Sequence, residues 1–566
     1  MKAAALLAIH FISDIKYVRS RASPLVASLC GTGAAFLSAH LDRFVSENLP
    51  PADQWPRLLF ELPQLRYPRV LNCATELLDK PARANPDAVA IRAAQGEWTY
   101  GQLLATVNQL CRVLTEDLRF VPGNRVLLRA ANSPMMIATW LAVARAGGVI
   151  VATMPMLRAR ELQTIVEKGR ISLALCEASL AAELEEVRAA GTTLERVVTW
   201  NGELETLMRS RPASFDAVAT TQDDPCLLAF TSGTTGQPKA TVHFHRDVLA
   251  MADTFSSHLL RPSASDVFTG TPPIAFTFGL GAELVFPFRV GASTAILGGT
   301  RPEHIVEGID RFGITRLFTA PTAYRGMLGA LPGKPFASLR TCVSAGEHLP
   351  KATFEAWRES TGLNIVNGIG ATEMIHIFIS AAGDDIRPGS TGKAVPGYRA
   401  CVLDDEMKAA PPGTVGKLAV RGPTGCRYLA DERQKRYVVD GWNLTGDAYV
   451  MDEEGYFWYQ ARTDDMIVSA GYNIAGPEVE AALLEHPAVA ECAVIGVPDE
   501  ERGQIVKAFV VLRPGHEATP QITSTLQSFV KGTIAPYKYP RAVEYLRELP
   551  KTPTGKLQRF KLRAGG

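Results

Sequence analysis

Residues 226–239 of the chain read CLLAFTSGTTGQPK, an apolar run that leads directly into a loop of glycines and hydroxyl side chains. The glycines let the backbone turn with its N–H groups inward, and the hydroxyls and Lys239 add donors and a positive charge. This arrangement predicts a concave polyphosphate site at the end of a strand. It differs from the GxxxxGK[ST] loop of GTPases and kinases, because two residues separate Gly236 from Lys239 and Ala240 follows.

Short β-rich runs alternate with helical stretches on both sides of this loop. Strands are predicted over residues 125–130, 149–152, 226–230, 316–319, 339–343 and 364–366. Helices are predicted over residues 134–146 and 247–260. Strands that alternate with helices indicate parallel β–α–β units, whose functional loops gather at the carboxyl ends of the strands. The predicted fold class is therefore α/β.

The segments before and after this α/β region have different sequence patterns. Residues 41–78 are rich in proline and aromatic residues, and we expect an irregular segment that wraps over a core. After about residue 400 the pattern changes to hairpins. A small α+β domain follows, with a helix over residues 477–485 and strands over 489–495 and 505–512. The expected parts are a leader over residues 1–40, a large body with mixed and parallel sheets over 41–463, and a small mobile domain over 464–566.

Composition excludes several classes of protein. The 566 residues contain 59 Lys and Arg against 58 Asp and Glu, so the net charge is +1, which argues against an electrostatic nucleic-acid binder. The 46% hydrophobic content argues against a disordered chain. Nine scattered cysteines without a CxxC pair predict reduced thiols and a cytoplasmic protein. No stable membrane association is expected, because Pro24, Gly31 and Gly33 make residues 22–39 a poor spanning helix. Residues 1–40 are expected to be a disordered or mis-started leader without function, and a targeting segment is the alternative.

Five further motifs follow the loop in order. They are NGIGATE at 367–373, LTGD at 444–447, ARTDD at 461–465, SAGYNI with EVE at 469–480, and PTGK at 553–556. Together with TSGTTGQPK they resemble the signatures of the adenylate-forming superfamily, which includes acyl- and aryl-CoA ligases, luciferases and peptide-synthetase adenylation domains. The resemblance covers about residues 41–563. It implies a large adenylation domain, a small C-terminal domain, and the use of ATP, Mg²⁺ and coenzyme A.

The resemblance also implies roles for individual residues. Glu373 would ligate Mg²⁺, a hard cation that prefers oxygen ligands, and Thr372 would contact the α-phosphate. Asp447 would accept hydrogen bonds from the ribose hydroxyls with support from Arg462. The residues implied to line the ATP site from the phosphate loop and the adenine wall are Thr231, Ser232, Gly233, Thr234, Thr235, Gly236, Lys239, Gly346, Glu347, Asn367, Gly368, Ile369 and Gly370.

Three positions are implied to work through the small domain. Lys556, on a Pro-Thr-Gly turn, would bind the substrate carboxylate and the α-phosphate and offset the charge that builds up during adenylation. Asp464 would be the hinge between the domains. Gly471, beside Tyr472, would let the pantetheine arm of CoA pass close to the backbone after the small domain rotates.

The segment 272–281, PPIAFTFGLG, is expected to line the acyl pocket. It lacks the aspartate with which amino-acid adenylation domains pair an α-ammonium. Phe276 and Phe278 instead offer flat apolar walls for an aromatic ring, next to Thr277 and Gly279. His376 is expected either to point into this pocket or to be an ordinary interior histidine.

The resemblance is strongest to benzoate-type and 2-aminobenzoate–CoA ligases, through FGLG, ATEMIHIF, the opening NLPP and QWP, and YNIAGPE. The expected function is an ATP-dependent aryl-carboxylate–CoA ligase for aromatic compound degradation, acting as a monomer or homodimer. The alternatives are another carboxylic acid, alicyclic or fatty, the loading of a carrier protein in trans, and a non-catalytic scaffold.

Overall fold

Residues Ala39–Gly566 form one unit of the chain, and Met1–Ser38 form another. The computed structural model describes residues 38–231, 238–331, 333, 336–463, 465–469, 472–499, 502–534, 536–551 and 557–564. The predicted leader therefore lies almost wholly outside the described residues, and its role stays a prediction.

A six-stranded sheet carries the phosphate loop, in the spatial order β6-β5-β3-β4-β7-β8. Its strands are β3 (Arg125–Arg129), β4 (Val149–Thr153), β5 (Leu173–Glu177), β6 (Arg196–Trp200), β7 (Pro225–Thr231) and β8 (Lys239–Phe244). All neighbours pair in parallel except β7 and β8. Its helices are α5 (Pro134–Arg145), α6 (Ala159–Gly169), α7 (Ala182–Ala189) and α8 (Glu203–Met208). The predicted β–α–β pattern is confirmed.

Local sequence explains why these elements form. Every residue of β3 and β4 is buried, as in parallel sheets whose two faces are both covered. The helix α5 begins where the Ser133 side chain accepts a hydrogen bond from the backbone N–H of Met136, and Pro134 occupies its first position. The helix that connects the two strands is thereby fixed at its start.

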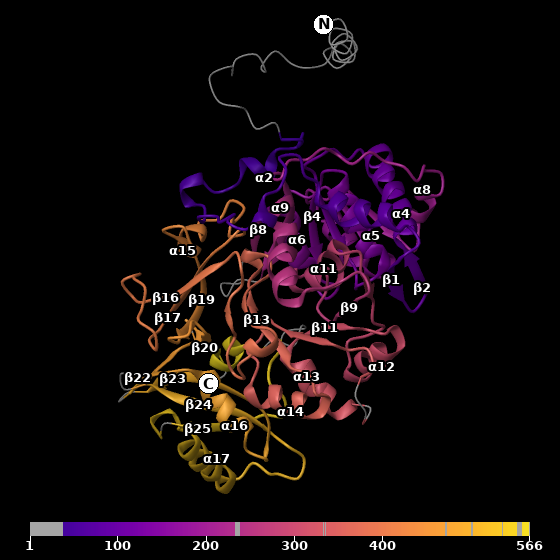
Figure 1. Cartoon of the computed structure of the whole chain (residues 1–566). Helices are drawn as coiled ribbons and strands as arrows, with labels where there is room; N and C mark the ends of the chain where they lie inside the picture. The colour runs from indigo at the N-terminus through magenta and orange to yellow at the C-terminus, as the bar shows by residue number, and fades with distance from the viewer. Residues whose placement is uncertain are drawn as a thin grey trace, which may run out of the picture. The chain divides into compact units, whose positions relative to one another are not determined.

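A nine-stranded sheet supplies the rest of the body, in the order β15-β14-β13-β12-β11-β9-β10-β1-β2 (Figure 1). Its strands are β1 (Val89–Ala93), β2 (Gly96–Thr99), β9 (Val267–Gly270), β10 (Ser293–Ala295), β11 (Arg316–Thr319), β12 (Thr341–Ser344), β13 (Ile365–Gly370), β14 (Ile377–Ser380) and β15 (Lys393–Ala394). Further helices of the body are α4 (Tyr100–Arg112), α9 (His245–Met251), α10 (Thr277–Leu280), α11 (Phe286–Arg289), α12 (Pro302–Phe312), α13 (Pro321–Met327) and α14 (Lys351–Thr361). The strands β11, β12 and β13 run in parallel, with Thr319, Ser344 and Asn367 side by side near their carboxyl ends.

The last third of the chain begins with an antiparallel sheet. Its strands are β16 (Arg399–Leu403), β17 (Val415–Arg421), β18 (Val438–Val439), β19 (Trp442–Met451) and β20 (Phe457–Arg462), with α15 (Gln434–Tyr437) between β17 and β18. The hairpins predicted after residue 400 are confirmed.

The C-terminal segment has its own sheets and its own core. The strands are β21 (Ile467–Ser469), β22 (Tyr472–Ile474), β23 (Val489–Asp499), β24 (Gly503–Leu512) and β25 (Ala542–Tyr545), and the helices are α16 (Gly476–Leu484), α17 (Pro520–Thr533) and α18 (Arg559–Ala564). Apolar residues of α16, α17 and β23–β24 pack together, including Val479, Leu483, Val494 and Leu526. The domain boundary at Asp464 stays a prediction, since that residue lies outside the described ones.

Two expectations need correction. The helix predicted over residues 247–260 begins earlier, at His245, and is π-helical over Ala252–Leu260. The segment 41–78, expected to be irregular, contains α2 (Phe44–Glu47) and a π-helical turn over Thr75–Asp79 that continues into α3 (Lys80–Ala84). Apolar side chains that pack on the main core, such as Leu77 and Leu78, outweigh the weak local signal there.

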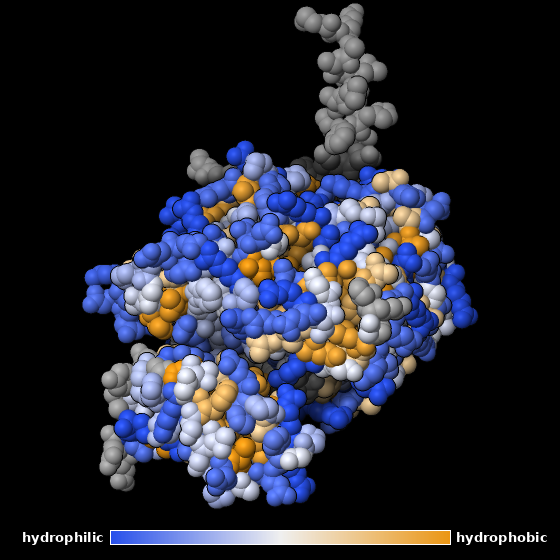
Figure 2. Space-filling model, turned by 60° about the horizontal axis from the view of Figure 1, so that its bottom comes forward, coloured by the Kyte–Doolittle hydropathy of each residue, from blue (hydrophilic) through white to orange (hydrophobic). Residues whose placement is uncertain are grey.

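Polar residues predominate on the face shown in Figure 2, where apolar residues form small separate groups. In the described part of the chain, the exposed large apolar side chains are Leu41, Val70, Val121, Met156, Val415 and Tyr537. None of the helices in that part has both the length and the apolar character needed to cross a membrane.

Candidate active site

The predicted phosphate loop connects two antiparallel strands at the edge of the six-stranded sheet. Thr231 at the end of β7 is the register partner of Lys239 at the start of β8, so both ends of the loop are held by the ladder. Ser232, Gly233, Thr234, Thr235 and Gly236 lie outside the described residues, and their contacts with phosphate stay predictions.

Two cations outside the sequence motifs hold the end of this loop. Lys168 donates to the carbonyl oxygen of Pro238 over 3.1 Å and to Asp431 over 2.8 Å. Arg433 also donates to Asp431, over 2.5 Å, and reaches the same Pro238 oxygen at 3.4 Å. Burial alone would raise the pKa of Asp431, but the hydrogen bonds from Arg433 and Lys168 lower it overall. The carboxylate therefore stays charged and fixes both cations beside the loop.

Glu373 lies in a single 3₁₀ turn, Thr372–Met374, that follows β13. It is 8% exposed, and the Tyr428 hydroxyl donates a hydrogen bond to its Oε1 over 2.5 Å. The same hydroxyl lies 3.1 Å from Lys239 Nζ. The backbone oxygen of Thr372 lies 2.7 Å from Nε2 of His243 on β8. Glu373, Thr372 and Lys239, which the sequence grouped only through motifs, are thus joined in one network.

The donor set at Glu373 fits a magnesium ion. A buried carboxylate gives a hard cation the oxygen ligand that it prefers. Glu373 Oε1 accepts the hydrogen bond from the Tyr428 hydroxyl, whereas Oε2 accepts no hydrogen bond from any described residue. A bound Mg²⁺ would supply charge neutralisation to ATP phosphates at this position.

The residues expected at the adenine wall follow adjacent strands. Gly346 and Glu347 lie directly after β12, and Asn367, Gly368, Ile369 and Gly370 belong to the neighbouring strand β13. Because the strands are parallel, these residues share one edge of the nine-stranded sheet with Glu373. Ile369 is half-buried and packs against the main core.

Asp447 and Arg462 face each other on the antiparallel strands β19 and β20. Arg462 Nη1 donates to Asp447 Oδ1 over 3.0 Å and to the Thr445 carbonyl oxygen, also over 3.0 Å. The side chain of Asp447 is 12% exposed and that of Arg462 is 44% exposed. The carboxylate is therefore oriented by one cation and sheltered from bulk water.

The predicted acyl segment lies after β9 and forms the short helix α10. Thr277 and Gly279 are buried, while Phe276 and Phe278 are half-buried. Gly279 has no room for a side chain, because a Cβ there would lie 2.2 Å from the backbone oxygen of Pro273. The segment is thus folded tightly on itself, with Phe278 facing the ring of Phe318 at 5.9 Å.

His376 lies in a cage of aromatic rings. Its ring centroid is 4.6 Å from Phe286, 5.5 Å from Phe255 and 5.7 Å from Phe278. Both ring nitrogens are buried and lack a hydrogen bond of good geometry with a described residue, although the backbone of Phe278 lies close enough to act on the ring. Burial lowers its pKa to about 3, and the nearby backbone of Phe278 offsets only part of that effect. His376 therefore contacts the predicted acyl segment and presents a neutral ring.

The backbone before His376 is strained. Ile375 has φ 64° and ψ −35°, a region that β-branched residues rarely adopt. Strain of this kind is retained where the surrounding structure enforces it, often at functional sites. It sets the direction in which the chain leaves Glu373 and enters the aromatic cage.

For four predicted residues of the small domain, the side chains lie outside the described part of the structure. Lys556, Asp464 and Gly471 lie outside the described residues. The backbone of Tyr472 begins β22 and pairs with Ser469, and its side chain is not described. The roles of all four stay predictions.

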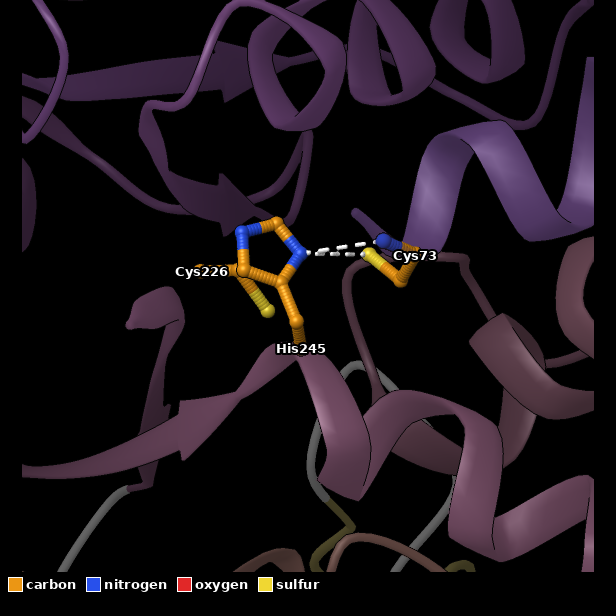
Figure 3. Close-up of side chains that lie close together, drawn as sticks. All are labelled: Cys73, Cys226 and His245. Carbon is orange, nitrogen blue, oxygen red and sulfur yellow. Dashed lines mark hydrogen bonds between the residues drawn. The ribbon is translucent and has the colours of Figure 1, made fainter. Parts of the chain in front are cut away.

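A second polar cluster lies at the base of the phosphate-loop hairpin (Figure 3). It contains Cys73, Cys226 at the start of β7, and His245 directly after β8, with their ligand atoms within 4.8 Å of one another. However, His245 Nδ1 accepts a hydrogen bond from the backbone N–H of Cys73 over 3.1 Å and also lies 3.2 Å from its Sγ. A metal at Nδ1 would need the lone pair that the amide already uses. The hydrogen bond from the Cys73 amide to His245 therefore ties the segment before α3 to the hairpin.

Comparisons with known proteins agree with this geometry. The profile described as AMP-binding enzyme matches residues 78–428, and that of the AMP-binding enzyme C-terminal domain matches residues 478–556. The chain belongs to the AMP-binding enzyme family. Its α/β fold is that of the adenylate-forming enzymes, as the sequence motifs predicted.

Individual relatives of this AMP-binding enzyme are CoA ligases and synthetases by name. The benzoate–CoA ligase of Thauera aromatica is 34% identical over 89% of this chain and 97% of its own length. The mitochondrial acyl-coenzyme A synthetase ACSM3 of Mus musculus is 34% identical over 82% of this chain and 84% of its own. Among solved structures, the anthranilate CoA ligase AuaEII in complex with anthranoyl-AMP is 35% identical, covers 88% of this chain and 98% of its own, and superposes with a TM-score of 0.84.

Proposed function

We propose that this AMP-binding enzyme is an ATP-dependent carboxylate–CoA ligase whose acid is aromatic, with 2-aminobenzoate or benzoate as the best candidates. It is an acid–thiol ligase that releases AMP. The observation that carries the aromatic assignment is the position of neutral, unpaired His376 among Phe255, Phe278 and Phe286. Flat apolar walls favour an aromatic ring, and an unpaired imidazole favours a polar substituent on it.

The residues divide the work of the first half-reaction. The phosphate loop and Lys239 bind the triphosphate, Glu373 holds the Mg²⁺, and Asp447 orients the ribose. Lys556 neutralises charge on the carboxylate and α-phosphate while the carboxylate attacks and pyrophosphate leaves. The carboxylate is already an anion, so no general base is needed.

The second half-reaction uses the predicted small domain over residues 464–566. The domain turns about Asp464 and removes Lys556, and the CoA thiol attacks the acyl adenylate beside Gly471 and Tyr472. The thioester forms as the bond to AMP breaks. Loading of a carrier protein in place of CoA is the competing use of the same adenylate.

A thioester assay tests this function. Purified protein is incubated with ATP, Mg²⁺, CoA and 2-aminobenzoate, and acyl-CoA, AMP and pyrophosphate are quantified by chromatography. We expect one AMP and one pyrophosphate per thioester. Release of ADP, or activity only with a phosphopantetheinyl carrier protein in place of CoA, would contradict the assignment.

An aliphatic acid is the second candidate, because the ACSM3 relative named above is an acyl-coenzyme A synthetase. A straight chain would match the flat apolar faces of Phe276 and Phe278 less well than an aromatic ring does. Competition between hexanoate and benzoate in the same assay separates the two candidates.

A further inference from the structure

Tyr428 connects the phosphate-loop hairpin to the carboxylate that is proposed to hold Mg²⁺. Neither a motif nor a family role pointed to this residue in the sequence. Its hydroxyl lies between Lys239 Nζ, at 3.1 Å, and Glu373 Oε1, at 2.5 Å. The ammonium also lies 5.1 Å from the centre of the Tyr428 ring. One side chain therefore contacts both charged groups.

The backbone of Tyr428 reaches this place as an added edge strand. The N–H of Val242 on β8 donates to the carbonyl oxygen of Arg427 over 2.8 Å, and the N–H of Leu429 donates to the carbonyl oxygen of Ala240 over 2.9 Å. Tyr428 itself faces Thr241 in an antiparallel bridge. The segment 427–429 thus extends the six-stranded sheet beyond β8.

Two buried interactions hold that added strand in register. Arg427 pairs with Asp247 over 2.9 Å, and both side chains are fully buried. Gln434 accepts a hydrogen bond from the backbone N–H of Tyr428 over 2.9 Å and donates to the carbonyl oxygen of Cys426 over 3.1 Å. The backbone of Tyr428 is therefore held in place, and this fixes the position of its hydroxyl.

A phenol has one proton to donate and an oxygen that accepts. An ammonium only donates and a carboxylate only accepts, so the proton of Tyr428 goes to Glu373 and its oxygen accepts from Lys239. The hydroxyl thus separates two opposite charges that would otherwise attract each other directly. A carboxylate paired with an ammonium offers a weaker field to a second cation.

We propose that Tyr428 is a positioning residue that keeps Lys239 off Glu373, so that the carboxylate remains available to the cation bound with ATP. This inference rests on the proposed function and adds to it the residue that governs metal dependence. Lys239 has a long flexible stem, so loss of the hydroxyl lets its ammonium move onto Glu373.

The test compares Tyr428→Phe with Tyr437→Phe by calorimetric titration of ATP, once with Mg²⁺ and once with EDTA. Both changes keep the aromatic ring and remove one hydroxyl. Tyr437 is a matched control, because it packs edge-on against Tyr428 at 5.7 Å and its buried hydroxyl has no partner among the described residues. Neither acid nor CoA is needed, so the measurement is independent of the substrate.

We expect the ratio of ATP affinities with and without Mg²⁺ to be about tenfold smaller in Tyr428→Phe than in the wild type, a loss on the scale of one charge-assisted hydrogen bond. Tyr437→Phe should match the wild type. In a Glu373→Gln background, adding Tyr428→Phe should have no further effect. An equal Mg²⁺ effect in wild type and Tyr428→Phe, an equal loss in Tyr437→Phe, or additive losses with Glu373→Gln would overturn the proposal. A wild type that binds no ATP would overturn the proposed function as well.

Discussion

Arg462 Nη1 donates a hydrogen bond to Asp447 Oδ1 over 3.0 Å, across two antiparallel strands on which the residues are register partners. The arginine is largely exposed, while the carboxylate is mostly sheltered. Arg462 therefore orients the carboxylate of Asp447. This is the arrangement needed for a carboxylate that accepts hydrogen bonds from two neighbouring hydroxyls of a ribose.

Asp447→Asn should weaken nucleotide binding. The amide keeps the shape but loses the charge, and hydrogen bonds to a charged group contribute about 1.5–3 kcal/mol. We expect the KM for ATP in pyrophosphate exchange to rise about tenfold, and the preference for ATP over 2′-deoxy-ATP to shrink. Asp440→Asn makes the same chemical change at an exposed turn before β19 and should leave the KM for ATP unchanged. An unchanged KM in Asp447→Asn would remove Asp447 from the ribose site.

Lys556→Ala should separate the two half-reactions. Loss of a cation that stabilises developing charge slows adenylation by about 10²–10³-fold. Thioester formation from supplied acyl adenylate should remain nearly intact. Lys551→Ala is the control, because Lys551 precedes the same motif in the sequence and pairs with Glu491 over 2.5 Å. An equal fall of both half-reactions in Lys556→Ala would contradict its assignment to adenylation alone.

His376→Leu should change substrate preference. Because the pKa of His376 is lowered to about 3, the ring is neutral at physiological pH and can accept a hydrogen bond from an ortho-amino group. We expect kcat/KM for 2-aminobenzoate to fall about tenfold, with benzoate little affected, and the preference of the wild type to stay constant from pH 6 to pH 9. Phe278→Leu, which removes an aromatic wall of the pocket, should reduce kcat/KM for both substrates by a similar factor. A wild-type preference that follows a titration in that range would be inconsistent with a neutral ring.

Glu283→Gln should make the fold more stable than that of the wild type, by a margin that grows as the pH rises. Glu283 is 1% exposed, and burial raises its pKa well above the usual value, although the N–H of Gly270 donates to its Oε1. Above pH 4.5 the unfolded chain releases this proton while the folded protein keeps it, so the native state loses stability by up to about 1.4 kcal/mol per pH unit.

Thermal unfolding between pH 5 and pH 8 measures this effect. The Tm of Glu283→Gln should exceed that of the wild type by an increasing margin as the pH rises. Glu303, at the first turn of α12, is a surface comparison whose replacement by Gln should give no such trend. A margin that is constant with pH would show that Glu283 does not keep its proton.

The sequence patterns predicted features that neighbouring residues form, and missed the contacts between segments that are far apart in the chain. The strand before the phosphate loop and the strand that leads to Glu373 are encoded by neighbouring residues, and the sequence predicts both. Tyr428 lies 55 residues from Glu373 and 189 from Lys239, and it meets them only because residues 427–429 pair with β8. The pair of His245 and Cys73, 172 residues apart, depends likewise on packing.

The central claim is that the chain activates an aromatic carboxylate by adenylation. Its most direct test is ATP–pyrophosphate exchange by the purified protein over benzoate, hydroxybenzoates, 2-aminobenzoate, cyclohexanecarboxylate and straight-chain fatty acids. We predict the highest exchange rate with 2-aminobenzoate or benzoate. A straight-chain acid as the preferred substrate, or no exchange with any carboxylate, would contradict this account.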